Sequence, residues 1–225
     1  MNNLNILYED NHVIVVVKPF NVLSQSDVTG DIDMLTLVKQ YIKVKYNKPG
    51  NVYVGLVHRL DRPTSGIMVF AKTSKAASRL SEQIRTHQFN KEYIAVVHGI
   101  MESNEGTMID YIKKEDKRAI ITTENDEKTG NDWKRAELKY EVIDVNQKEN
   151  LSLVDIFLIT GRYNQIRVQF ASRNHPLYGD NKYGKLDKNQ LCLVAKTLEF
   201  IHPTTKEVMT FKIDVDKNMS GFDKF

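Results

Sequence analysis

The sequence has little of the residues that cross-link a chain or carry it through a membrane. It contains a single cysteine, Cys192, so no internal disulfide can form, and this fits a reducing compartment. The longest aliphatic run, residues 13–17, is far shorter than the roughly 20 apolar residues that a membrane-spanning helix needs. The N-terminus MNNLNILYED has no basic segment followed by an apolar one, so it shows no secretory signal. We therefore expect a cytoplasmic protein that does not enter a membrane.

Metal and nucleotide sites also lack their usual sequence signals. The six histidines are scattered, and no pair has the HExxH spacing of a zinc hydrolase. The HRLD segment differs in spacing from the kinase HRD segment, and no glycine-rich phosphate loop follows a strand. We expect no bound metal and no nucleotide cofactor.

The charge of the chain is unevenly distributed along the sequence. The net charge is only +3, but residues 58–93 carry seven basic against three acidic side chains, and residues 161–196 carry seven against two. Between these segments, residues 102–150 carry thirteen acidic against nine basic side chains. Two basic segments that converge in the fold would attract a polyanion such as nucleic acid. Charge alone still favours the simpler alternative, in which both segments are solvated faces of a mildly basic protein.

Hydrophobic patterning predicts a mixed order of strands and helices in a chain of 225 residues that is 41% hydrophobic. Amphipathic helices are expected at residues 33–46, 74–85 and 164–172. Residues 113–133 have few apolar positions, so we expect a mobile loop or an excursion from the sheet there. Strands are expected at residues 5–8, 13–18, 52–57, 67–71, 92–97, 136–145, 151–159, 191–200 and 208–215. This order fits an α+β fold with a mixed, mainly antiparallel sheet better than a regular βαβ alternation.

Three polar side chains stand in strand or turn contexts that could carry chemistry. Asp61 lies between Arg59 and Arg62 in the segment VHRLDRPTSG, which connects two expected strands. Tyr93 begins the apolar strand in KEYIAVV, and Arg167 lies on the expected helix in TGRYNQIRVQF. Each has an ordinary alternative: a surface salt bridge for Asp61, a core or rim position for Tyr93, and a phosphate-contacting or solvated position for Arg167.

Five segments occur in an order that resembles the RluA-type family of RNA pseudouridine synthases. In chain order they are ILYEDNHVIVVVKP, HRLDRPTSGIMVFAKTS, KEYIAVVHG, TGRYNQIRVQ with HPLYGDNKYG, and LEFIHPTTKE. The resemblance covers nearly the whole chain and implies one catalytic domain over residues 1–225, with a basic cleft and no separate N-terminal RNA-binding module. It also implies an isomerase that cuts the N1 glycosidic bond of uridine and rejoins the base through C5, without a cofactor.

The resemblance further implies roles for individual residues. Asp61 matches the essential catalytic carboxylate, and Arg167 is similar to the arginine that pairs with it. Tyr93 is similar to a tyrosine that stacks on the target base and can take part in proton transfer. Arg59 matches a basic residue that can fill the gap left by the displaced uridine. The RNA-binding set that we expect comprises Arg59, Arg62, Lys72, Lys91 and Arg162.

These residue types suit the implied reaction. An aspartate with its ordinary pKa near 3.9 is ionised at neutral pH, and a nearby arginine would keep Asp61 ionised in a dry site. Removing a base from its stack costs a few kcal/mol. Stacking on an aromatic ring such as that of Tyr93 returns about 1 to 3 kcal/mol per base.

The chain departs from the family pattern at three positions where many relatives carry histidine: Asn164, Gln169 and Val194. No histidine role is therefore expected there. Two other classes stay open, because a non-catalytic RNA-binding module would tolerate Asp61→Asn, and a glycosidase or nucleosidase would use Asp61 with a second carboxylate and release free base. We expect a monomer that acts on RNA, either tRNA or rRNA.

Overall fold

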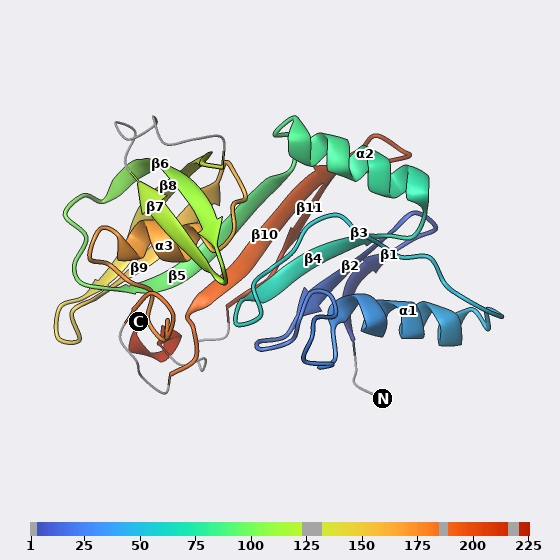
Figure 1. Ribbon diagram of the computed structural model, residues 1–225, viewed down its shortest axis with the longest axis horizontal. Coiled ribbons are helices and arrows are strands. Elements are labelled where there is room, and N and C mark those ends of the chain that lie inside the picture. Colours follow the sequence, from blue (N-terminus) through green and yellow to red (C-terminus); the bar gives the residue numbers. More distant parts are fainter. Residues whose placement is uncertain (1–3, 123–131, 185–188, 216–220) are drawn as a thin grey trace. The chain divides into compact units, whose positions relative to one another are not determined.

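The computed structural model describes residues 4–122, 132–184, 189–215 and 221–225. Its chain divides into two compact units, which are described separately below (Figure 1). Unit 1 comprises Met1–Asn90 with Ala195–Ile213, and unit 2 comprises Lys91–Val194 with Asp214–Phe225. The single catalytic domain expected from the sequence stays a prediction. Among the described residues, no helix is long and apolar enough to cross a membrane.

The strands of unit 1 pair in the order β1, β2, β4 and β10, with β3 beside β4 and β11 beside β10. The pairs β1–β2, β2–β4, β3–β4 and β10–β11 are antiparallel. The strand predicted at residues 52–57 is shorter than expected, because only Gly55 and Leu56 pair with β4. The strands are β1 (Asn5–Glu9), β2 (Val13–Lys18), β3 (Gly55–Leu56), β4 (Ser65–Ala71), β10 (Leu193–Ile201) and β11 (Val208–Lys212).

Two helices cover the strands of unit 1 on opposite sides (Figure 1). Helix α1 (Met34–Lys45) begins at Asp33, whose side chain accepts a hydrogen bond from the Thr36 N–H. Helix α2 (Ser74–Arg85) is capped by the side chain of Thr73, which accepts a hydrogen bond from the Ala76 N–H. Four consecutive residues of β2, from Val13 to Val16, are fully buried, as expected for a strand covered on both faces.

The strands of unit 2 pair in the order β5, β9, β8, β6 and β7, and each of these neighbouring pairs is antiparallel. Helix α3 (Gln165–Ala171) places Val168 against Ile112, Ala119 and Ala136 of three strands. The strands are β5 (Asn90–His98), β6 (Glu105–Glu115), β7 (Arg118–Thr122), β8 (Lys134–Asn146) and β9 (Leu151–Leu158), and a short 3-10 helix, η2 (Phe222–Lys224), lies near the C-terminus.

The hairpin β6–β7 corrects the loop expected over residues 113–133, of which residues 123–131 lie outside the described part. Strand β6 alternates buried and more exposed residues, with Met108, Asp110 and Ile112 buried on one face. Asp110 hides this alternation in the sequence, because an aspartate is rarely buried. Here it accepts hydrogen bonds from Gln169 and Arg173, which satisfy its charge.

Candidate active site

Asp61 lies in unit 1 at a turn that leads into β4. The Thr64 N–H donates to the Asp61 carbonyl at 3.0 Å, which closes the turn. The Asp61 side chain is half-buried, while Arg59, two residues earlier, is exposed. A carboxylate in this setting has both a fixed backbone and access to a ligand.

Both backbone neighbours of Asp61 are fixed from inside unit 1. The Ser24 hydroxyl donates to the Leu60 carbonyl at 2.7 Å and accepts from the Leu60 N–H at 3.1 Å. On the other side of Asp61, the Lys18 ammonium donates to the Arg62 carbonyl at 2.9 Å. Because Ser24 and Lys18 are both buried, these bonds are shielded from competition with water.

Lys18 is a fully buried lysine beside the Asp61 turn. Its Nζ donates to the carbonyls of Pro19 at 3.1 Å and Val22 at 2.6 Å as well as to that of Arg62. Three carbonyls match the three N–H donors of an ammonium group. Burial lowers the pKa of Lys18 to about 7, although the negative charge of Asp61 acts to raise it. Lys18 thus ties the loop after β2 to the residue that follows Asp61.

Two residues of the expected RNA-binding set have protein partners in unit 1. Arg62 forms an ion pair with Asp31 at 2.7 Å, and it remains partly exposed. Lys72 pairs with Glu9 at 2.7 Å, donates to the Asp10 carbonyl and has a side chain only 9% exposed. The charge of Lys72 is thus satisfied inside unit 1 in the absence of RNA, and its predicted contact with RNA stays a prediction.

Arg167 lies on α3 in unit 2 and is buried. Its Nε and Nη2 donate to the two carboxylate oxygens of Asp180 at 2.8 and 2.7 Å. Asp180 also accepts from the backbone N–H groups of Lys182 and Tyr183 at 2.9 and 3.1 Å. Burial acts to raise the pKa of Asp180, but these donors outweigh it and lower that pKa. The predicted pairing of Arg167 with Asp61, a residue of unit 1, stays a prediction.

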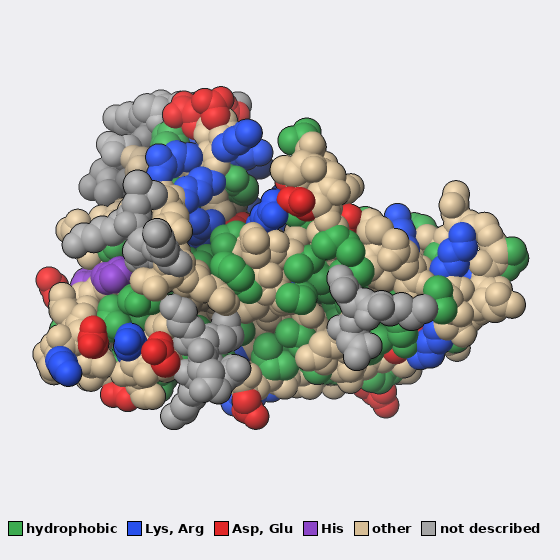
Figure 2. Space-filling model, turned by 90° about the horizontal axis from the view of Figure 1, so that it is seen from below, with side chains coloured by type: hydrophobic (Ala, Val, Ile, Leu, Met, Phe, Trp, Pro, Cys, Tyr) green, Lys and Arg blue, Asp and Glu red, His purple; other side chains and the backbone are tan. Residues whose placement is uncertain are grey.

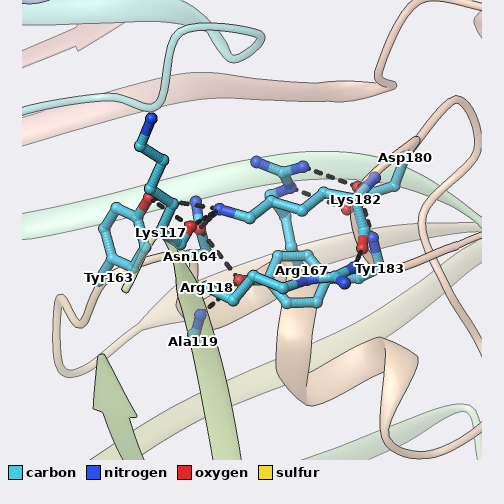
Figure 3. Close-up of polar contacts among 9 residues, drawn as sticks. All are labelled: Lys117, Arg118, Ala119, Tyr163, Asn164, Arg167, Asp180, Lys182 and Tyr183. Carbon is cyan, nitrogen blue, oxygen red and sulfur yellow. Dashed lines mark hydrogen bonds and ion pairs between the residues drawn. The ribbon is translucent and has the colours of Figure 1, made fainter. Parts of the chain in front are cut away.

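Figure 3 shows the side chains that surround the Arg167–Asp180 pair. The Tyr183 ring centroid lies 5.3 Å from the Arg167 guanidinium carbon. The Tyr183 hydroxyl accepts from the Ala119 N–H at 2.7 Å and donates to the Asn164 side-chain oxygen at 3.1 Å. The same Asn164 oxygen accepts from Lys182 Nζ at 2.9 Å. One network therefore joins β7, the start of α3 and the loop that carries Asp180.

Tyr93, Lys91 and Arg162 also lie in unit 2. Tyr93 is buried in β5, with 5% of its surface exposed. Lys91 is half-buried, and burial lowers its pKa to about 8. A Cβ on Gly161 would lie 3.5 Å from Lys91 Nζ, so the Lys91 ammonium is beside the segment that carries Arg162. Arg162 itself donates from Nε to the Arg135 carbonyl at 2.8 Å.

The surface of unit 2 is rich in basic and aromatic side chains. Lys and Arg side chains gather on the left of the space-filling view, where unit 2 lies (Figure 2). The ammonium groups of Lys114 and Lys182 lie 5.1 and 4.9 Å from the Tyr163 ring centroid. Within the described part of the chain, no group of three His, Cys, Asp or Glu side chains could hold a metal ion.

Comparison with known proteins decides the family. A family model described as RNA pseudouridylate synthase matches residues 12–172, which is more than half of the chain. The dual-specificity RNA pseudouridine synthase RluA of Haemophilus influenzae is 33% identical over 220 residues, 95% of this chain and 94% of that protein. This chain belongs to the RluA-type family of RNA pseudouridine synthases. As a pseudouridine synthase it is an isomerase that makes pseudouridine in RNA, and the predicted family and reaction class are confirmed.

Other relatives agree with this assignment. A Bacillus subtilis (strain 168) protein described as an uncharacterized RNA pseudouridine synthase is 35% identical over 221 residues, 97% of this chain and 70% of that protein. The solved structure of human RNA pseudouridylate synthase domain containing 4 has a TM-score of 0.77 at 21% identity, over 95% of this chain and 89% of that one. The corresponding human domain containing 1 has a TM-score of 0.72 at 23% identity, over 96% and 84%. These structures confirm the predicted α+β fold of the synthase.

Sequence reasoning missed three residues that hold the expected site residues in place. Lys18 carried a weak signal, as a charged residue at the end of an aliphatic strand. Asp180 lies in the quoted segment HPLYGDNKYG, which was given no role. Ser24 carried no signal, because one serine in a polar loop has no distinguishing pattern.

Proposed function

We propose that this synthase isomerises specific uridines in structured RNA, tRNA or rRNA, with Asp61 as the catalytic carboxylate. The observation that carries the proposal is the placement of Asp61, a half-buried carboxylate whose backbone is held on one side by Ser24 and on the other by Lys18. Such a fixed backbone limits the positions that the carboxylate can take, which is what a reaction at one carbon of one nucleotide requires.

The reaction needs an ionised carboxylate but no oxidant and no added water. The N1–C1′ bond of uridine breaks and a C5–C1′ bond forms on the same base. C5 loses its proton and N1 gains one, so substrate and product contain the same atoms. Addition of Asp61 to C6 of the base and action of Asp61 at the sugar both require the anion that an aspartate supplies at neutral pH.

The other site residues serve the same chemistry in this proposal. Arg167 keeps Asp61 ionised when the bound base excludes water, because a nearby cation favours the charged form. Tyr93 stacks on the flipped base and offsets part of the cost of unstacking it. Basic side chains contact phosphates and set the position of the RNA rather than read its sequence. The proposed RNA-binding set is Arg59, Arg62, Lys72, Lys91 and Arg162.

We further propose that the enzyme works as a monomer in the cytoplasm and needs no cofactor. Activity of the purified protein after exhaustive dialysis against a chelator is the expected result.

Chemical mapping of pseudouridine tests the role of Asp61. RNA from cells that lack this enzyme is incubated with wild-type protein, with Asp61→Asn and with Asp144→Asn, which changes an exposed aspartate of unit 2. The wild type and Asp144→Asn should add pseudouridine at the same defined uridines, and Asp61→Asn should add none while still binding RNA. The sites gained identify the RNA substrate.

The alternative functions give different results in the same experiment. If the Asp61→Asn variant modifies the same uridines as the wild type, the Asp61 carboxylate is not required for the reaction. Free uracil and abasic sites in place of pseudouridine would indicate a nucleosidase. RNA that is bound by the wild type but never modified would indicate a binding module.

A further inference from the structure

The bond between Arg167 and Asp180 fixes the orientation of a guanidinium group. Both side chains are buried, with 7% of Arg167 and 0% of Asp180 exposed. The two contacts, Nε to Oδ2 at 2.8 Å and Nη2 to Oδ1 at 2.7 Å, form a bidentate pair. A bidentate pair fixes the plane of the guanidinium and its rotation in that plane, whereas a single hydrogen bond does not.

Asp180 is itself held by the backbone of its loop. Its Oδ1 accepts from the N–H groups of Lys182 and Tyr183, and the Gly184 N–H donates to its carbonyl at 2.9 Å. Gly179, just before it, has φ of +74°, and a Cβ there would lie 2.1 Å from the Gln190 carbonyl oxygen. The loop therefore packs too closely for the carboxylate to move freely.

Tyr183 restrains the guanidinium along a second direction. Its ring faces the guanidinium carbon of Arg167 at 5.3 Å, within the range of a cation–π contact. The ring cannot turn away easily, because its hydroxyl bonds to both Ala119 and Asn164 (Figure 3). Asp180 thus holds the edge of the guanidinium, and Tyr183 holds its face.

From this geometry we infer that Asp180 is a positioning residue for the isomerisation and acts only through Arg167. An arginine has five N–H donors, and Asp180 takes two of them, on Nε and Nη2. Holding that edge determines where the three other donors point. The inference rests on the proposed role of Arg167, whose remaining donors would serve the anion of Asp61.

A second Arg–Asp pair in unit 2 provides a matched control. Arg173 follows the C-terminus of α3 and donates from Nη1 and Nη2 to the carboxylate of Asp110 at 3.0 and 3.1 Å. Asp110 is buried like Asp180, but its carboxylate accepts hydrogen bonds from Gln169 and Arg173 instead of from Arg167. The variant Asp110→Asn therefore removes an equivalent charge from the same unit without disturbing the Arg167 guanidinium directly.

Single-turnover kinetics with the RNA identified by mapping tests the inference. Asp180→Asn should lower the rate constant for pseudouridine formation by about 10- to 100-fold, because a small misplacement of a reacting group has effects of that size. Its dissociation constant for the RNA should stay within about 3-fold of the wild type. Asp110→Asn should change both quantities by less than about 3-fold. A role of Asp180 in stability alone predicts instead that both variants lower the melting temperature and neither lowers the rate constant of the folded protein.

A double-mutant cycle decides whether Asp180 acts through Arg167. In an Arg167→Gln background, the further change Asp180→Asn should leave the rate constant unchanged. If Asp180→Asn alone fails to fold, the cycle is run with Asp180→Glu, which keeps the charge but alters its reach. A loss that persists in the Arg167→Gln background overturns the inference.

The proposed role of Arg167 can fail separately. If Arg167→Gln retains wild-type turnover, that role is wrong, and the inference falls with it. If Arg167→Gln loses turnover but Asp180→Asn and Asp180→Glu do not, the role of Arg167 stands and only the positioning role of Asp180 is overturned.

Discussion

The two units hold their buried cations by different means. In unit 1, the ammonium of Lys18 donates to three backbone carbonyls and has no carboxylate among these hydrogen-bond acceptors. In unit 2, the guanidinium of Arg167 forms a bidentate pair with the carboxylate of Asp180. Carbonyl dipoles offset burial less completely than a full opposite charge, and the pKa of Lys18 falls to about 7.

This difference separates two uses of a buried cation in the fold. A cation surrounded by carbonyls organises the backbone, because each bond fixes a different stretch of chain around one point. In a cation paired with a carboxylate, the orientation of the cationic side chain itself is fixed by its partner. Lys18 accordingly places the turn that carries Asp61, whereas Asp180 orients the side chain of Arg167.

The largest effect is expected from Lys18→Met, which removes the ammonium group that donates to three backbone carbonyls of unit 1. Three carbonyl oxygens lose their partner, and each unsatisfied buried group costs about 1 to 3 kcal/mol. Urea denaturation should therefore show a loss of about 3 kcal/mol or more, against less than about 0.5 kcal/mol for the exposed control Lys75→Met. Equal losses in the two variants would mean that the carbonyl contacts of Lys18 do not stabilise the fold.

An intermediate effect is expected from pH, in a different range for Lys18 and for Asp180. The pKa of Lys18 is about 7 in the folded protein, below its ordinary value near 10.4. Between these values the unfolded chain binds more protons, so the free energy of unfolding rises with pH, by about 1 kcal/mol from pH 7 to 8. The pKa of Asp180 is lowered, so its contribution is present above about pH 4 and is lost as pH falls through the folded pKa.

Urea denaturation between pH 2.5 and 9 measures both contributions. Lys18→Met should remove the rise that begins near pH 7 and leave the acid side unchanged, while the rise that Lys91 causes from about pH 8 should persist. The double variant Arg167→Gln with Asp180→Asn should reduce the acid-side loss and leave the alkaline side unchanged. The assignment is wrong if Lys18→Met alters the acid-side slope, or if the double variant alters the alkaline slope.

The smallest effect is expected from Asp31→Asn, which removes an ion pair that is not buried. Arg62 and Asp31 have side chains 37% and 48% exposed, so water and salt screen their attraction. The free energy of unfolding should fall by less than about 1 kcal/mol, and the difference should shrink further in 0.5 M salt. If Asp31→Asn lowers the free energy of unfolding as much as Lys18→Met does, solvent exposure does not explain the difference between the Arg62–Asp31 ion pair and the buried contacts of Lys18.

The elements that the sequence predicted well are those whose signals are local. Val38 and Ile42 recur at helical spacing after the Asp33 cap, and α1 forms there as predicted. Strand β6 was missed because the partners that permit a buried Asp110 are remote: Arg173 is 63 positions along the chain. The strand expected at residues 52–57 was too long because an apolar run does not reveal how many of its residues find a partner strand.

The candidate site was predictable as a set of residues but not as a set of contacts. The resemblance to the synthase family identified Asp61, Tyr93 and Arg167, although their roles stay predictions. It could not show that Lys72 forms an ion pair with Glu9, since the two residues are 63 positions apart in the sequence. Nor could it show Lys18 beneath the Asp61 turn, because a lysine before a proline usually marks the exposed end of a strand.

The two bonds between Ser24 and Leu60 have a practical consequence for studying this enzyme in solution. The Leu60 amide lies in a segment without regular secondary structure, yet its proton points to a buried hydroxyl. It should exchange with deuterated solvent far more slowly than the amides of an ordinary loop. A single assigned amide signal would therefore report whether the turn that carries the aspartate stays closed, without any RNA present.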